Sequence, residues 1–198
     1  MGRDAAAAAA RTLLGLKIEA LVSWGTAGAL SPDVRSGDLL LPDNVLAGDG
    51  RYLVTDQAWL ERIRQALQPA SLTIHNGPMT EARKILTWAA TKQELHLRTG
   101  ALAADMETAA ILDIAISGKV PCIAIRAVVD EAHMTIPEAL VKHLDRYGRP
   151  GPTGLIVEIF RSPRLISELY RLGTAMRKAM TTLQTLAGRT NSTLMYKS

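Results

Sequence analysis

Three short stretches place carboxylates, glycines and a hydroxyl where runs of apolar residues end: SWGTAGAL at 23–30, ADME at 104–107 and RAVVDE at 126–131. The last two contribute Asp105, Glu107 and Asp130. In the first, the glycines let backbone N–H groups approach an anion or a ribose closely, and Thr26 adds a hydroxyl. Each apolar run predicts a buried strand, and open α/β sheets bind ligands beyond the carboxyl ends of their strands. Together the stretches predict one ligand site.

Each stretch also has an ordinary structural explanation. A glycine-rich segment after a strand is most often only a turn. Asp105 and Glu107 precede a predicted helix, whose first N–H groups and dipole favour nearby carboxylates. Asp130 could cap whatever follows its strand. For Asp105 or Glu107 alone, the structural role explains the residue at least as well as chemistry does.

Helices and strands alternate along the first 130 residues. Because the strands lack polar alternation, we expect an α/β sandwich whose sheet is covered on both faces. Thr91 is the predicted N-cap of its helix, and Gly48-Asp49-Gly50 predicts a hairpin turn. The predicted helices are 4–16, 57–67, 91–100 and 107–118; the predicted strands are 20–24 before the glycine-rich turn, 37–42, 45–54, 71–79, 84–89, 101–106 and 121–130.

The last third of the chain is predicted to be helical, at 136–148, 153–162 and 163–186. A length of 198 residues suits a single domain, residues 1–198, with a sizeable core. We therefore expect the helices from about residue 136 to pack on the sheet, which is where they can bury their apolar sides.

The composition is that of a globular protein, with 47% hydrophobic and 21% charged residues. The net charge is +4, but Lys and Arg are scattered without interleaved aromatics, which argues against a nucleic-acid groove. No apolar stretch reaches the length of a membrane-spanning helix. The single Cys122 excludes a disulfide framework and indicates a reducing, cytoplasmic compartment. The four histidines lack metal-ligand spacing, so we expect no metal site.

In order and spacing, VSWGTAGALSPDVRSGDLLLP, ADMETAAIL and IRAVVDEA resemble the signature stretches of the purine nucleoside phosphorylase and methylthioadenosine/adenosylhomocysteine nucleosidase superfamily. The resemblance runs over residues 2–132. It implies a three-layer sandwich with a mixed central sheet, and an enzyme that breaks a purine N-glycosidic bond. It also implies a homo-oligomer and no cofactor, with inorganic phosphate as a co-substrate if the reaction is a phosphorolysis.

The resemblance assigns roles to individual residues. Glu107 matches a glutamate that accepts hydrogen bonds from the ribose 2′- and 3′-hydroxyls, and Met106 matches a methionine that packs against the sugar. Asp130 matches an aspartate that donates a proton to purine N7; burial would raise its pKa toward that duty. The loop on the nucleophile and sugar side corresponds to Gly25, Thr26, Ala27 and Gly28, whose backbone would bind water or phosphate.

Three further residues receive less definite roles. Arg126 matches a family arginine, and substrate contact and a structural ion pair with a nearby carboxylate explain it equally well. Trp88 falls near the segment that covers the base in relatives, although core packing is the better explanation for its residue type. Asp105 matches an acidic position whose role looks structural.

The segment from Leu140 to Leu172 resembles the branch associated with hopanoid biosynthesis, which implies removal of adenine from adenosylhopane. Such a lipid-linked nucleoside would need an open, apolar mouth, and would allow peripheral contact with a membrane. Leu165, Ile166, Leu169 and Leu172 share one helical face and are candidates for lining it, with core packing as the better explanation.

The chain departs from the family at its start. Family members usually begin with a strand and, in the hydrolytic members, a glutamate that activates water. A start assigned too late is the favoured explanation, because a missing strand would leave unpaired backbone groups; a true short form is the alternative. Hydrolysis and phosphorolysis therefore both stay open. Methylthioadenosine/adenosylhomocysteine nucleosidase activity is an alternative, as is a noncatalytic nucleoside-binding or assembly subunit.

Overall fold

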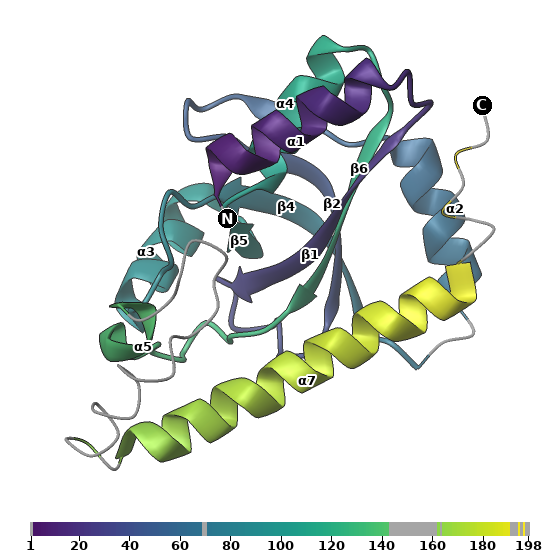
Figure 1. The fold of residues 1–198 in the computed structure, drawn as a ribbon. Coiled ribbons are helices and arrows are strands. Elements are labelled where there is room, and N and C mark those ends of the chain that lie inside the picture. Colours follow the sequence, from purple (N-terminus) through teal and green to yellow (C-terminus); the bar gives the residue numbers. More distant parts are fainter. Residues whose placement is uncertain are drawn as a thin grey trace.

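The computed structural model describes residues 2–68, 71–142, 162, 164–190, 194 and 196. Within these residues, six strands form one mixed sheet in the order β3-β2-β4-β5-β1-β6 (Figure 1). Strand β2 also pairs with β6, so the sheet closes on itself into a small barrel. The strands are β1 Leu21–Ala29, β2 Leu39–Leu46, β3 Tyr52–Val54, β4 Ile74–Glu81, β5 Ala103–Asp105 and β6 Cys122–Val128.

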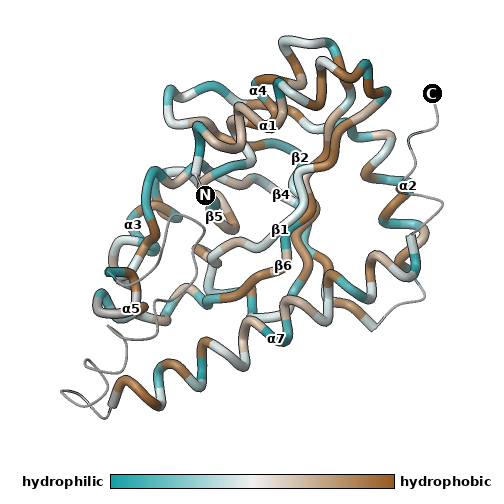
Figure 2. The backbone as a smooth tube through the Cα atoms, in the orientation of Figure 1, coloured by the Kyte–Doolittle hydropathy of each residue, from teal (hydrophilic) through white to brown (hydrophobic). Residues whose placement is uncertain are grey.

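Helices cover the sheet on both sides, as the sequence predicts. Helices α1 and α4 pack together on one face, while α2 and the long α7 cover the other (Figure 1). Strand β6 is largely brown, and so hydrophobic, in Figure 2, and every residue of β6 is buried. The helices are α1 Arg3–Gly15, α2 Gln57–Leu67, α3 Ala89–Thr99, α4 Thr108–Ser117, α5 Glu138–Lys142 and α7 Arg164–Thr190. No helix of the described residues is long and apolar enough to cross a membrane.

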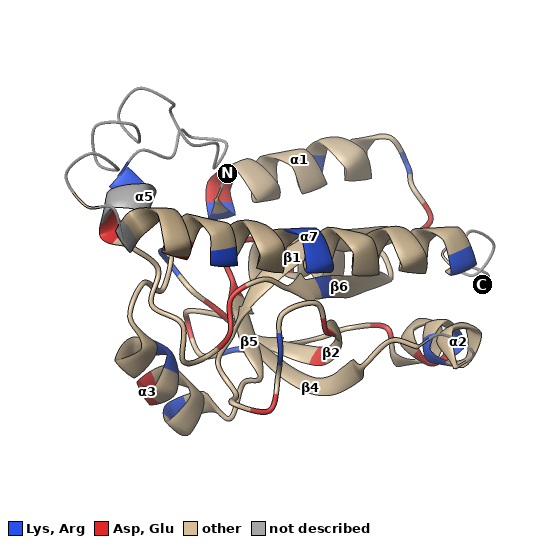
Figure 3. Cartoon of the chain, turned by 90° about the horizontal axis from the view of Figure 1, so that it is seen from below, with Lys and Arg blue, Asp and Glu red and all other residues tan. Residues whose placement is uncertain are grey.

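Helix α7 lies across the sheet, with its basic residues spaced along its length (Figure 3). Ala175, Ala179, Leu183 and Leu186 are buried at helical spacing and join the core formed with β2, β6 and α2. The two alanines let the helix backbone approach the strands closely. This half of α7 anchors the helix, so its preceding turns are held over one end of the sheet.

Three local predictions are wrong. The stretch Gly25–Gly28 is not a loop but part of β1, because it pairs with β6 through Ala27 and with β5 from Gly28. Residues 84–88 do not form a strand; β4 ends at Glu81 and a loop leads into α3. That helix begins after Trp88, not at a Thr91 cap. The predicted helix at 153–162 falls, except for its last residue, outside the described residues.

Candidate functional site

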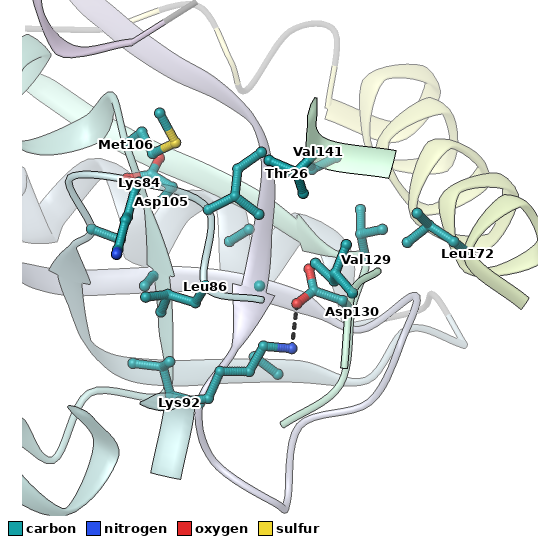
Figure 4. A pocket seen from close by; sticks show the side chains of 18 of the residues that line it. Thr26, Lys84, Leu86, Lys92, Asp105, Met106, Val129, Asp130, Val141 and Leu172 are labelled. Carbon is teal, nitrogen blue, oxygen red and sulfur yellow. Dashed lines mark ion pairs between the residues drawn. The ribbon is translucent and has the colours of Figure 1, made fainter. Parts of the chain in front are cut away.

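A cavity of about 460 Å³ opens where β1, β5 and β6 end, beneath α7 (Figure 4). Its polar wall includes Thr26 of β1, the segment from Asp105 to Glu107 after β5, and Asp130 after β6. The last two residues of β1 pair with β5, while the residues before them pair with β6. One strand therefore brings together all three stretches singled out in the sequence.

Asp130 occupies a tight place in this cavity. A Cβ added at Gly28 would lie 3.0 Å from both oxygens of the Asp130 carboxylate, closer than such contacts normally come. Glycine is therefore the residue that lets the carboxylate lie against the end of β1. The backbone adds to this arrangement, because the Ala29 N–H donates to the Asp130 carbonyl at 2.8 Å.

Lys92 of α3 is a site residue that the sequence analysis missed. Its side chain is 1% exposed, and its Nζ lies 2.6 Å from Asp130 Oδ2, the dashed contact in Figure 4. A signal for it existed: Lys92 shares one helical face with Leu95, His96 and Thr99, which are all at least partly buried. The many polar residues of TKQELHLRTG hide this inward face in the sequence.

Glu107 and Met106 enter the cavity from the turn between β5 and α4. Glu107 is the N-cap residue of α4, but its side chain makes no capping hydrogen bond, so the carboxylate is not committed to the helix. Burial raises the pKa of Glu107, and the negative charge of Asp105 adds to the rise, while Arg126 and a backbone N–H oppose it. Glu107 is thus a half-buried carboxylate facing the cavity.

Asp105 is committed to the structure instead. Its carboxylate accepts hydrogen bonds from the backbone N–H and the hydroxyl of Thr108, in the first turn of α4. It also forms an ion pair with Arg126 at 2.7 Å, where both side chains are 3% exposed. Arg126 donates further to the carbonyl and hydroxyl of Ser23. Of the two roles open for Arg126, the structure shows the ion pair, and this arginine is not among the described residues that line the cavity.

The other candidate residues fall in different places. Thr26, Ala27 and Gly28 line the cavity, whereas Gly25 lies against the Arg126 guanidinium. Trp88 is 56% exposed and donates to Glu138, so the expectation of core packing is wrong for it.

The four residues proposed for the mouth of the site divide among three environments. Leu169 and Leu172 line the cavity, Leu165 is buried, and Ile166 is exposed. The part of α7 that overlies the site therefore contributes apolar side chains to its wall.

Among the described residues, no cluster of three or more His, Cys, Asp or Glu side chains could hold a metal ion. Burial raises the pKa of the Cys122 thiol to about 12, so it is a poor nucleophile. The site offers carboxylates, an ammonium and a hydroxyl for acid–base and hydrogen-bonding chemistry.

The chain resembles known proteins in sequence and in fold. A 5′-methylthioadenosine/S-adenosylhomocysteine nucleosidase from Thermotoga maritima is 26% identical over 136 residues, which cover 66% of this chain and 62% of that protein. The chain thus spans less than two thirds of that relative's length.

Solved structures share the fold at lower identity. A nucleosidase of the same kind from Campylobacter jejuni matches with a TM-score of 0.63 and 21% identity, over 67% of this chain and 65% of that one. A Helicobacter pylori nucleosidase with butyl-thio-DADMe-Immucillin-A matches with a TM-score of 0.69 and 15% identity, over 95% and 76%. A Helicobacter pylori futalosine hydrolase mutant also matches, with a TM-score of 0.61 and 16% identity, over 65% and 66%.

The family model described as the phosphorylase superfamily matches residues 1–147, which include every strand of the sheet and each polar residue of the cavity wall described above. The chain belongs to the phosphorylase superfamily.

Proposed function

We propose that this chain carries the site of an enzyme that cleaves the N-glycosidic bond of an adenine nucleoside. One observation carries the proposal: Glu107, Met106 and Asp130 line the same cavity, although they come from two separate turns. The Thermotoga maritima relative, a 5′-methylthioadenosine/S-adenosylhomocysteine nucleosidase, supports the choice of substrate class. A cavity of about 460 Å³ is within the range of small-molecule sites.

The reaction builds positive charge on the ribose while the base leaves with extra electron density. Glu107 is proposed to accept hydrogen bonds from two ribose hydroxyls, and its negative charge stabilises the developing cation. Met106 packs against the sugar. Asp130 is proposed to bind the N7 edge of the base, where a proton must arrive as the bond breaks.

The stretch Gly25–Gly28 takes a different part from the one expected of a loop. Its backbone belongs to the sheet through pairing with β6 and β5. We propose that its contribution to the site is the Thr26 side chain and the close approach that Gly28 allows to Asp130. A water molecule or phosphate on the sugar side would meet that hydroxyl rather than a row of free N–H groups.

The far wall of the cavity is apolar and favours a large apolar group on the ribose 5′ position. Val141 of α5 and Leu169, Leu172 and Met176 of α7 form this wall. Adenosylhopane, with its hydrocarbon substituent, is the substrate we propose. Methylthioadenosine, whose 5′ thioether is smaller, fits the polar half of the site equally well through its adenosine, and the relative's activity favours it.

Detection of free base tests the function directly. The purified protein is incubated with methylthioadenosine or adenosylhopane, with and without inorganic phosphate, and adenine is measured by chromatography. We expect adenine release that Glu107→Ala reduces strongly. Dependence on phosphate would establish phosphorolysis, and release without it hydrolysis. Nucleoside binding without any release would contradict the enzyme and leave a noncatalytic binding subunit.

The raised pKa of Glu107 predicts how ribose binding depends on pH. The carboxylate must be ionised to accept both hydroxyl hydrogen bonds, and its pKa lies above the usual value of 4.5. Affinity for a nucleoside analogue should therefore weaken on acidification before an ordinary glutamate would be protonated. Calorimetric titrations across pH 4–7 should show this loss in the wild type. Glu107→Gln should bind more weakly and lose the same pH dependence; an unchanged dependence would exclude Glu107 as its origin.

A further inference from the structure

The outer side of α7 exposes four large apolar side chains. Ile166, Tyr170, Met176 and Met180 are between 43% and 70% exposed. Ile166 and Tyr170 are four residues apart, as are Met176 and Met180, so within each pair the side chains are neighbours on the helix surface. A helix that covers a sheet normally keeps its outer side polar. Because Met176 also lines the cavity, these exposed side chains border the candidate site.

The same helix accounts for the charge excess of the whole protein. It contains five Lys and Arg residues and one acidic residue, Glu168, which gives it a formal charge of +4. The net charge of the entire chain is also +4, so the rest of the chain is neutral overall. Figure 3 shows α7 lying in front of the sheet with these basic positions along it. Positive charge concentrated on one outer element attracts an anionic surface.

A recess of about 260 Å³ lies between α7 and the turn that follows β6. Arg171 and Lys178 line it from the helix, and neither forms a salt bridge with another residue that the structure describes. The acidic residue that lines the recess, Glu131, is already paired with Arg35. The two basic side chains are therefore left to bind an anion, and a guanidinium matches the geometry of a phosphate particularly well.

Two kinds of occupant could cover an apolar and basic helix surface: a second copy of this chain or a lipid bilayer. In a symmetric dimer the same patch of both copies meets, so the basic side chains of two α7 helices would face one another. An anionic bilayer supplies the opposite charge instead, and its interface takes up the apolar side chains. Charge complementarity thus favours the bilayer.

We propose that the outer side of α7 is a docking surface for a membrane that contains anionic phospholipids. Ile166, Tyr170 and Met180 enter the interface between headgroups and acyl chains. Arg171 and Lys178 bind the headgroup phosphates. Docking places the cavity beside the bilayer, which suits a nucleoside with a large apolar 5′ group; this consequence, unlike the docking itself, rests on the proposed function.

Sedimentation with vesicles tests the docking. The full chain is mixed with vesicles of phosphatidylcholine alone, or of equal parts phosphatidylcholine and phosphatidylglycerol, and the bound fraction is measured. We expect binding to the anionic vesicles, and we expect Arg171→Gln with Lys178→Gln to weaken it about 30-fold, since each basic residue near an anionic surface contributes similarly. Arg11→Gln with Lys17→Gln is the matched control, because it removes the same charge from exposed positions at α1, on the other face of the sheet.

The apolar contribution is tested separately. Ile166→Ser with Tyr170→Ser should weaken vesicle binding, whereas Leu16→Ser with Leu97→Ser, which changes exposed apolar residues elsewhere, should not. All these positions are exposed, and circular dichroism checks that each variant is folded.

Four results would overturn the proposal. The first is a wild type that does not bind anionic vesicles, and the second is an equal loss of binding in the α7 variants and their controls. The third is a change of oligomeric state in Ile166→Ser with Tyr170→Ser while vesicle binding is unchanged, which would assign the patch to a second copy. The fourth is release from vesicles by inorganic phosphate at constant ionic strength, which would make the recess a site for free phosphate. Failure to cleave any nucleoside, with vesicle binding intact, would reject the proposed function and not the docking.

Discussion

Replacing Arg126 with methionine is expected to lower the free energy of unfolding by about 3–5 kcal/mol, the typical cost of breaking a buried ion pair by removing one partner. The guanidinium joins β6 to β1 through Ser23 and to the start of α4 through Asp105 and Thr108. Methionine would leave the Asp105 carboxylate, whose side chain is 3% exposed, without a countercharge. Urea denaturation followed by circular dichroism measures the change.

Two further variants show whether the loss comes from the buried charge. Arg51→Met breaks contacts of a largely exposed arginine with Asp49 and Asp113, so it should cost much less. Arg126→Met combined with Asp105→Asn should recover part of the stability, because the double variant leaves no unpaired buried carboxylate. If Arg126→Met and Arg51→Met destabilise the protein equally, the buried pair does not contribute as proposed.

The α/β architecture could be predicted from the apolar runs. The place of the site could be predicted from Asp105, Glu107 and Asp130, which stand where those runs end. Strand β6 could be predicted because its residues are apolar without alternation, as expected for a strand buried on both faces. The different roles of Asp105 and Glu107 could also be predicted, because the family resemblance places Asp105 at a structural position and Glu107 at a ribose-binding position. The structure shows Asp105 bonded to α4 and Arg126, and Glu107 free of the helix cap.

Pairing between distant segments explains what the sequence did not reveal. Gly25–Gly28 looks like a turn locally, but hydrogen-bonded neighbours on both sides keep it extended. The closure of the sheet between β2 and β6 depends on tertiary contacts for the same reason. The place of Lys92 in the site could not be predicted, because its partners are about 40 residues further along the chain. Trp88 is exposed although its residue type favours burial, since it stands where a loop enters α3.

Replacing Asp130 with asparagine is expected to lower kcat/KM for adenine release by about 10²–10⁴-fold, the usual contribution of a general acid or base. The amide keeps the shape that fits against Gly28 and can still accept a hydrogen bond from Lys92. It can neither deliver a proton to N7 nor carry the charge that orients the base. Steady-state kinetics with methylthioadenosine measures the loss, and circular dichroism checks that the variant is folded.

The division of the loss between kcat and KM identifies what Asp130 does. A residue that acts as the acid in the transition state should lower kcat, whereas one that only holds the base should raise KM and leave kcat unchanged. Asp33→Asn, at an exposed aspartate shortly after β1, is the matched control and should leave both constants near the wild-type values. An unchanged kcat in Asp130→Asn would mean that a group other than Asp130 delivers the proton to the purine.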